Sequence, residues 1–453
     1  METWKLLVTS ELLKQAFVSM KFGNLSPFKF PFAILRKLGV WIDGSSSWLY
    51  CIYGLLSHLF LIVGFIILHT VHFYQMMEQN KIEEVADVLN VLFTGVGVVF
   101  KTTWFIIKIK KIKVMQQNIN ELLKFNLFKV VEKREKVQKR VNYLRKGMKF
   151  YFSSGIVAVT AAIIQFFVKS KNKRLPYETW FYWDYKNNDV LLWSLAFYQY
   201  GVSIFGFCIS YSVDVIIIIF MVLLTSAFEE LSTEILFTEN ILSSPDNCKL
   251  ENYIKYHIKI KKFAEKISRD LSFPFFLQTF SSSIFLCTSI FLLSMVIWYS
   301  NLNLFNHSIW FQQISIHDDP VFFLRTLSYG VNILVQIYLP CYFGNELFLA
   351  SENISTNLFH SKLMVLGDGI KETAKSYDQK PMKSAQFMEK SLKRHHTALK
   401  VFFDNTKKAT TIKASGLIII DLQTFQSICN FSYSLYAVLN KVNQKWTSYY
   451  FFT

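Results

Sequence analysis

Residues 190–228 read VLLWSLAFYQYGVSIFGFCISYSVDVIIIIFMVLLTSAF, and Asp214 is the only charged side chain in this stretch. As a helix that rises roughly 1.5 Å per residue, the stretch would be about 58 Å long. The hydrocarbon core of a bilayer is about 30 Å thick, and a spanning helix needs roughly 20 apolar residues. The stretch therefore predicts a membrane-spanning helix that continues beyond the bilayer into water.

Six further apolar runs are long enough to cross a bilayer. They lie at Trp48–Thr70, Ala86–Lys108, Phe150–Val168, Phe273–Tyr299, Val321–Ala350 and Ala414–Leu439. The whole chain is 52% hydrophobic and 17% aromatic, which is typical of a large membrane domain. The predicted fold class is all-α, namely a polytopic membrane protein with seven transmembrane helices.

Lysine and arginine are distributed unevenly between the two sets of loops. The N-terminus and every second loop together carry roughly 39 of these residues, against about 8 on the other side. Short cytoplasmic loops retain positive charge, so we expect a cytoplasmic N-terminus and an extracellular C-terminus, the reverse of G-protein-coupled receptors. This arrangement explains the formal net charge of +17 without a nucleic-acid partner. No cleaved signal is expected, because residues 1–37 lack a compact apolar core.

The titratable residues do not point to catalysis or to a cofactor. The six cysteines are scattered, without the spacing of a metal site or of a disulfide framework. His395 and His396 have no acidic partner at short helical spacing and are interpreted as solvated cytoplasmic side chains. Internal repeats or helices broken at mid-membrane, which would indicate a transporter, are not seen. We therefore expect no enzyme activity, no metal and no cofactor.

A polar stripe runs along the last apolar stretch. Its members recur at intervals of three, four or seven residues, which places them on one face of a helix. They are Gln423, Ser427, Asn430, Ser434 and Lys441. Such a face avoids lipid, and it fits either hydrogen bonding between helices or the lining of a water-filled pore. Val438 lies near the outer end of the stripe, where a ring of apolar side chains from several subunits could close a pore by dewetting.

The second extracellular loop is unusually aromatic at residues 175–184, LPYETWFYWD. It fits either an aromatic belt at headgroup level or a lid over an apolar cavity between helix ends. A pocket for a small apolar ligand needs dispersion surface and one or two hydrogen-bonding groups. Suitable residues occur in the outer halves of spans two, three, four and six. These candidate ligand-binding residues are Phe93, Val96, Val159, Ile163, Phe197, Tyr200, Phe205, Tyr329 and Asn332.

Three ionisable side chains lie within the predicted spans, where such groups are candidates for function. Lys101 lies toward a cytoplasmic end and Arg325 toward an outer end, so both are expected to extend to the lipid headgroups. Asp214 is harder to explain in this way, although the length of its helix would place it near the cytoplasmic boundary.

The segment from Ser384 to Lys413 mixes basic and apolar residues close to helical spacing. It predicts an amphipathic cytoplasmic helix that either adsorbs to acidic lipid headgroups or packs against other subunits. The predicted organisation is a cytoplasmic N-terminal segment (1–47), spans one to six with the ligand pocket (48–350), a cytoplasmic amphipathic helical segment (351–413), and the seventh, pore-lining span with a short extracellular tail (414–453).

Two parts of the chain resemble the insect odorant receptor family. Residues 416–425, GLIIIDLQTF, and 432–439, SYSLYAVL, are similar to that family's C-terminal pattern of a small-residue start, a Leu/Thr-Phe core and an aromatic Ser-Tyr-Ser ending. Residues 341–347, CYFGNEL, are similar to the end of its sixth span. Two positions depart from the family, because Gln is frequent where this chain has Lys441 and Trp is frequent where it has Leu363.

The resemblance implies a tuning subunit, not the shared co-receptor, in a hetero-tetramer whose seventh spans line a central pore. It implies that a small volatile odorant binds among spans two, three, four and six and opens a non-selective cation channel. The expected location is the plasma membrane of sensory neurons, and the expected partners are the odorant, the co-receptor subunit and the lipid bilayer, with no nucleic acid. An insect gustatory-type ligand-gated channel is the alternative, and a membrane transporter is a more distant one.

Overall fold

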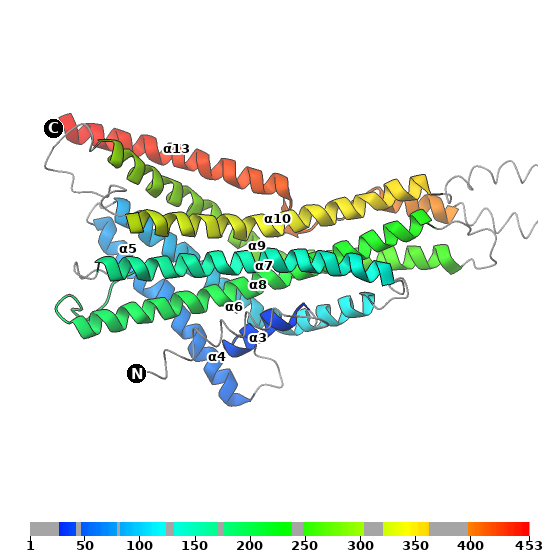
Figure 1. Cartoon of the computed structure of the whole chain (residues 1–453), viewed down its shortest axis with the longest axis horizontal. Coiled ribbons are helices and arrows are strands. Elements are labelled where there is room, and N and C mark those ends of the chain that lie inside the picture. The colour runs from blue at the N-terminus through cyan, green and yellow to red at the C-terminus, as the bar shows by residue number, and fades with distance from the viewer. Residues whose placement is uncertain are drawn as a thin grey trace, which may run out of the picture.

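The computed structural model describes residues 27–41, 47–78, 82–123, 131–169, 175–237, 248–302, 320–361 and 397–452. Within these ranges the chain is a bundle of long helices, most of which run nearly along one axis (Figure 1). A π-helical turn at Ile62–Ile67 joins α4 to α5. The helices are α3 (Lys29–Lys37), α4 (Trp48–Leu61), α5 (Leu68–Glu78), α6 (Ile82–Leu123), α7 (Val131–Lys169), α8 (Asp189–Phe237), α9 (Cys248–Leu302), α10 (Pro320–His360) and α13 (Leu422–Phe452).

Six stretches of helix in the described part of the chain are long and apolar enough to cross a membrane. They are Trp48–Glu78, Val88–Leu122, Lys139–Val168, Asp189–Leu236, Phe273–Ser294 and Val321–His360. Each coincides with one of the first six predicted spans, so the expected all-α, multi-pass membrane class is confirmed. The seventh predicted span overlaps α13, which is not among these six and along which the polar stripe runs.

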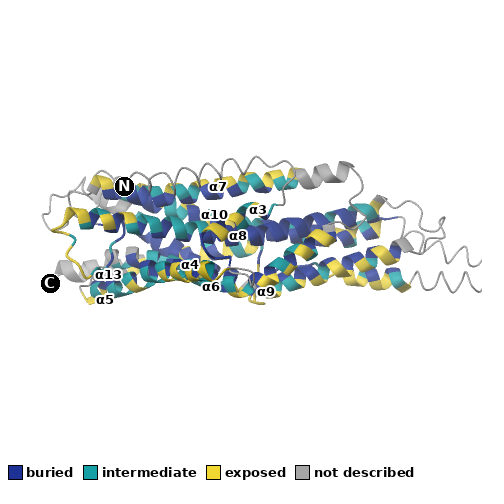
Figure 2. Cartoon of the chain, turned by 90° about the horizontal axis from the view of Figure 1, so that it is seen from below, coloured by how far each residue is buried: buried dark blue, intermediate teal, exposed yellow. Residues whose placement is uncertain are grey.

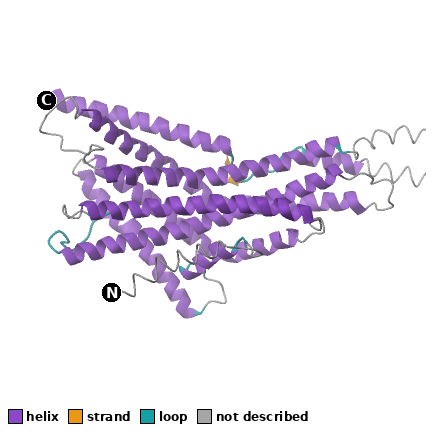
Figure 3. Cartoon of the chain, viewed as in Figure 1, coloured by secondary structure: helices purple, strands orange, loops and turns teal. Residues whose placement is uncertain are grey.

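The seventh helix begins at Leu422, not at Ala414 as the apolar run suggested. Residues Lys413–Ala414 instead pair antiparallel with Ile418–Ile419 in a short hairpin, drawn in orange beside α13 in Figure 3. Gly416 at the turn has a positive φ of 75°, which a right-handed helix cannot accommodate. Asp421 then caps the helix, since its carboxylate accepts a 2.8 Å hydrogen bond from the backbone N–H of Thr424.

Helix α8 forms the centre of the bundle. In its most apolar window 89% of the residues are buried, compared with 28% for Trp48–Glu78. Figure 2 shows the middle of α8 largely in the colour of buried residues, surrounded by helices with mixed surfaces. The run of β-branched and large apolar side chains that dominated the sequence is therefore the core against which α6, α7, α9 and α10 pack.

A helix at residues 397–406 packs against the end of the bundle where α9 begins. Phe402 is 2% exposed, and its ring lies 5.4 Å from that of His257 on α9. This described part of the predicted amphipathic segment therefore contacts its own chain, whereas residues 384–396 of that segment lie outside the described residues. At the same end, Arg140 of α7 forms ion pairs with Glu229 of α8 and Glu346 of α10.

Candidate functional site

A cavity of about 90 Å³ lies among the helices. Its lining comes from the π-helical turn, from five long helices and from the loop between α7 and α8. The lining residues are Phe65 of the turn; Asn90, Val91, Thr94 and Val98 of α6; Tyr151, Gly155, Ala158 and Val159 of α7; Tyr177 of the loop; Ser203, Phe207 and Ser210 of α8; Phe285 and Ser289 of α9; and Arg325, Thr326, Tyr329, Asn332, Ile333 and Gln336 of α10.

One aromatic wall of the cavity depends on two glycines. Phe65 lies between Gly95 of α6 and Gly206 of α8, and a Cβ atom on either glycine would clash with the Phe65 side chain. Phe65 belongs to the π-helical turn, a distortion that is frequent at functional sites. Small residues on two helices and an irregular turn on a third thus place a ring against the cavity.

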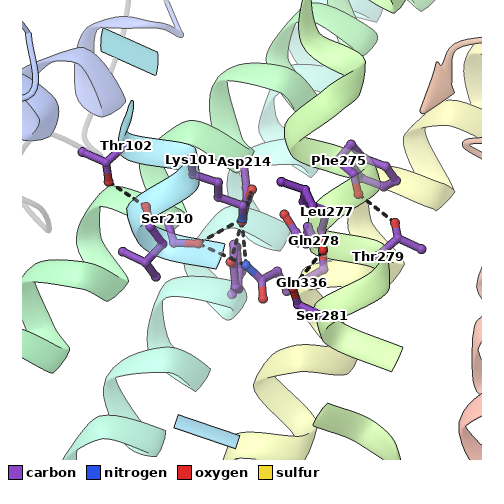
Figure 4. Close-up of polar contacts among 12 residues, drawn as sticks. Lys101, Thr102, Ser210, Asp214, Phe275, Leu277, Gln278, Thr279, Ser281 and Gln336 are labelled. Carbon is purple, nitrogen blue, oxygen red and sulfur yellow. Dashed lines mark hydrogen bonds and ion pairs between the residues drawn. The ribbon is translucent and has the colours of Figure 1, made fainter. Parts of the chain in front are cut away.

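The polar floor of the cavity is a cluster of five side chains from four helices, Lys101, Ser210, Asp214, Tyr151 and Gln336. Figure 4 labels Lys101, Ser210, Asp214 and Gln336. The Nζ atom of Lys101 on α6 lies 2.6 Å from Oδ1 of Asp214 on α8 and 3.0 Å from the Ser210 hydroxyl. The other carboxylate oxygen of Asp214 accepts hydrogen bonds from Tyr151 at 3.0 Å and from the Gln336 amide at 2.8 Å. Both charges are buried. Each is compensated by its counter-ion and by hydrogen bonds, and a buried ion pair is stable only with such compensation.

This geometry corrects the expectation that Lys101 and Arg325 extend to the lipid headgroups. Each of these two residues is 4% exposed. Asp214 draws the Lys101 ammonium into the bundle, and Arg325 donates a 3.1 Å hydrogen bond to the carbonyl of Pro176. Sequence spacing could not reveal these partners, because they lie on distant parts of the chain that only packing brings together.

The loop between α7 and α8 closes the end of the cavity remote from the polar floor. The Gln199 side chain accepts a 3.1 Å hydrogen bond from the Tyr177 N–H and donates to the Tyr177 carbonyl at 2.8 Å and to the Thr179 hydroxyl at 2.7 Å. The Tyr177 hydroxyl bonds to that of Tyr329 on α10. Tyr182 and Trp183, farther along the loop, are exposed. Residues 175–179 therefore form a lid, while Tyr182 and Trp183 point outward and Phe181 packs against a separate apolar cluster.

Three of the nine candidate ligand-binding residues line the cavity, namely Val159, Tyr329 and Asn332. The other six do not line the cavity. Val96 and Phe197 are exposed, and Phe93 is half-buried. Ile163 and Tyr200 pack in a separate apolar cluster, and Phe205 packs against Phe60. Other residues of the same helices α6, α7, α8 and α10 line the cavity, because the rotation of each helix about its axis was not visible in the sequence. Whether any of these residues contacts a ligand stays a prediction.

Sequence reasoning did not select the residues of the polar floor that line the cavity, Tyr151, Ser210 and Gln336. The available signal was Lys101 and Asp214, a basic and an acidic residue in two different predicted spans. Such charges usually pair within a membrane bundle. Pairing them would have brought α6 beside α8 and pointed to the floor.

The polar stripe of α13 faces away from the rest of the chain. Gln423, Ser427, Asn430, Ser434 and Lys441 are all exposed, and Val438 is 59% exposed. Ile428 and Ser432, on the opposite face, are buried, and the Ser432 hydroxyl donates a 3.1 Å hydrogen bond to the Ser283 carbonyl of α9. The hydroxyls of Ser427 and Ser434 bond to carbonyls of their own helix. The stripe is therefore available to water or to another subunit.

Comparison with known proteins places the chain among membrane receptors. The family model described as 7tm Odorant receptor matches residues 81–433. Odorant receptor 94a of Drosophila melanogaster is 24% identical over 132 residues, a match that spans 29% of this chain and 28% of that protein.

Two solved structures share the fold. The insect olfactory receptor OR5 from Machilis hrabei in complex with eugenol has a TM-score of 0.65 and 17% identity, covering 92% of this chain and 97% of that chain. A second structure of OR5 from Machilis hrabei has a TM-score of 0.65 and 16% identity, covering 95% of this chain and 98% of that chain. At these identities the likeness concerns the fold alone.

Proposed function

Since the chain belongs to the 7tm odorant receptor family, we propose that a small volatile odorant binds in the cavity and thereby opens a cation channel. The resemblance to insect odorant receptors read from the sequence is confirmed by this family match and by the shared fold. The protein is an odorant receptor and not an enzyme, and it is a multi-pass membrane protein.

The cavity is the observation that carries the proposal. One water needs about 10–15 Å³ of such space, so a cavity of about 90 Å³ has room for a small organic molecule. Its walls include the rings of Phe65, Phe207 and Phe285, which offer dispersion contacts, and a few polar groups that orient a ligand. The related receptor OR5 was solved in complex with eugenol, which supports a ligand of similar size here.

The exposed stripe of α13 supports a pore in an assembly of several subunits. A polar face within the membrane is costly unless it meets water or a partner helix. In the proposed channel, α13 helices of this chain and of a shared co-receptor surround the axis of a hetero-tetramer, and Val438 contributes to an apolar gate. The uneven loop charges support a cytoplasmic N-terminus. The proposed location, the plasma membrane of a sensory neuron, rests on the odorant receptor family.

Gating requires that the odorant bind the open arrangement more tightly than the closed one, since equal affinity for both shifts nothing. Two of the five long helices that line the cavity, α9 and α10, also pack against α13, the proposed pore helix. A ligand that changes the packing of α9 against α10 therefore has a direct mechanical connection to the proposed pore.

Whole-cell current recording tests the proposal. Cells would express this chain with an insect co-receptor, this chain alone, or the co-receptor alone, with surface labelling of each subunit. We expect a volatile panel to evoke a cation current that requires both subunits and whose ligand selectivity follows this chain. Silence across the panel, with both subunits confirmed at the surface, would contradict the proposed channel function.

A further inference from the structure

We propose that Ser289 of α9 is the hydrogen-bonding residue that selects the ligand, and that the ligand is a small neutral molecule with one hydroxyl or carbonyl oxygen on an apolar body. This proposal rests on ligand binding in the cavity. It adds a specificity-determining residue from a helix outside the four spans that the sequence indicated.

The Ser289 hydroxyl is buried and lacks a hydrogen-bond partner. The residue is 2% exposed, it lines the cavity, and its Oγ atom makes no hydrogen bond within the described part of the chain. A buried hydroxyl without a partner is unfavourable, and buried polar groups are nearly always hydrogen-bonded. A ligand oxygen in the cavity would supply the missing bond.

Other hydroxyls on α9 behave differently. Thr279, Ser281 and Ser283 each donate to the carbonyl four residues earlier, at 2.9, 2.9 and 2.8 Å. Thr288 donates to the Ile284 carbonyl at 3.1 Å and also to Asn90. A serine in a membrane helix ordinarily satisfies itself in this way. Ser289 departs from this pattern at the position where α9 reaches the cavity.

Several neighbouring polar groups of the cavity already have partners. The Ser210 hydroxyl accepts hydrogen bonds from Lys101 and Gln336, at 3.0 and 3.2 Å. The side-chain oxygen of Asn332 accepts a 3.1 Å bond from Ser154, and Tyr177 bonds to Tyr329. A ligand that bonded to these groups would have to break or share those contacts. Bonding to Ser289 breaks none of them.

The residues around Ser289 define the rest of the ligand. Phe285 lies one turn earlier on α9, on the same face, and its ring centroid is 6.2 Å from that of Tyr329. An apolar body would lie against these rings while its oxygen reaches Ser289. The buried ion pair of the polar floor is balanced internally. Arg325, the charged residue of the lining, already donates a hydrogen bond to the Pro176 carbonyl. Both observations favour a neutral ligand, and the charged probe below tests this.

Matched ligand sets test the proposal. Each set has one carbon skeleton with and without oxygen: n-hexane, 1-hexanol and 2-hexanone; and ethylbenzene, 1-phenylethanol and acetophenone. Hexanoic acid is added as a charged probe. Half-maximal concentrations would be measured in cells with the co-receptor, and ligand-induced thermal stabilisation would be measured on the purified receptor. The variants are Ser289→Ala, Ser289→Thr and, as a buried serine of α9 outside the lining, Ser283→Ala.

We expect the wild type to prefer the oxygenated member of a set about tenfold, a typical effect of one hydrogen bond. Ser289→Ala should remove that preference while the response to the hydrocarbon is kept, and Ser289→Thr and Ser283→Ala should retain it.

An unchanged oxygen preference in Ser289→Ala, or a stronger response to hexanoic acid than to 1-hexanol, would overturn the proposal. A wild-type receptor that neither conducts nor is stabilised by any probe would overturn both this proposal and the proposed function. A wild type that responds without oxygen preference would overturn only this one.

Discussion

Lys101 and Asp214 lie in the apolar interior of the bundle, on α6 and α8, and each depends on the other. Removing one partner leaves a buried charge without compensation, which typically costs about 3–5 kcal/mol. Replacing both with apolar side chains removes that penalty. The tyrosine and the amide that now bond to Asp214 would then lose an acceptor, so the recovery should be partial.

We therefore predict that Lys101→Met and Asp214→Leu each lower receptor stability by several kcal/mol, and that the double variant is more stable than either. Melting temperatures of the detergent-purified proteins, followed by size-exclusion chromatography, measure this. A double variant with the summed loss of the two single variants would show that the two residues do not act as a pair.

The cavity itself can be tested with one residue of α7. Ala158 is fully buried and lines the cavity, whereas its neighbour Val157 is 55% exposed. Ala158→Leu adds three carbon atoms at the cavity, and Val157→Leu adds one on the outer surface. We predict that Ala158→Leu reduces ligand responses at least tenfold with normal surface expression and that Val157→Leu does not. Concentration–response curves measure the effect, and equal curves for the two variants would argue against this cavity as the ligand site.

At the scale of elements, Gly344 sets how closely α10 approaches the segment that leads into α13. A Cβ atom at this position would clash with the backbone carbonyl oxygen of Ile420, which cannot move aside as a flexible side chain can. Gly330, on the same helix, has nothing within 4 Å of such an atom. The two glycines provide a matched pair, because both substitutions to alanine raise helix propensity by up to about 1 kcal/mol.

We predict that Gly344→Ala separates the hairpin from α10 and destabilises the protein by about 1–3 kcal/mol, as overpacking does. Gly330→Ala should be neutral or slightly stabilising. Limited proteolysis between residues 413 and 421, together with the melting temperature, reports on this packing. Equal behaviour of the two variants would mean that the hairpin tolerates a shift away from α10.

At the scale of the whole molecule, the helices continue beyond the apolar spans, and their extensions form a packed unit of their own. His257 of α9 lies there between Phe228 of α8 and Phe402 of the helix at 397–406, with ring centroids 6.4 and 5.4 Å away. Burial, together with the nearby Lys261, lowers the pKa of His257 from 6.5 to about 4. The folded protein therefore holds this imidazole neutral in a pH range where the unfolded chain binds a proton.

Because the unfolded state binds more protons between pH 6.5 and about 4, stability should fall as the pH decreases through that window. The expected loss from His257 is about 2 kcal/mol at pH 5 relative to neutral pH. We predict that His257→Phe, which keeps an aromatic ring in place, reduces the drop in melting temperature between pH 7.5 and pH 5. If wild type and variant lose the same amount, other groups control the acid sensitivity.

The sequence by itself determined the class of the protein. A helix that spans a bilayer must be long and apolar, so apolar runs such as 190–228 identify the membrane spans without knowledge of the helices that pack around them. The sequence also predicted that the last polar stripe shares one face of a helix, because helical periodicity is a local property. In the structure these residues of α13 are exposed. The family resemblance rested on equally local motifs, such as residues 341–347.

Only the tertiary structure decided which side chains meet. The pairing of Lys101 with Asp214 joins residues on separate helices, and the position of Phe65 depends on glycines of two other helices. The rotation of each helix placed Val159 in the cavity lining and turned Phe197 to the surface. In an apolar span nearly every face is hydrophobic, so the sequence carries little information about which face points inward. Packing against partners distant in the chain supplies that information.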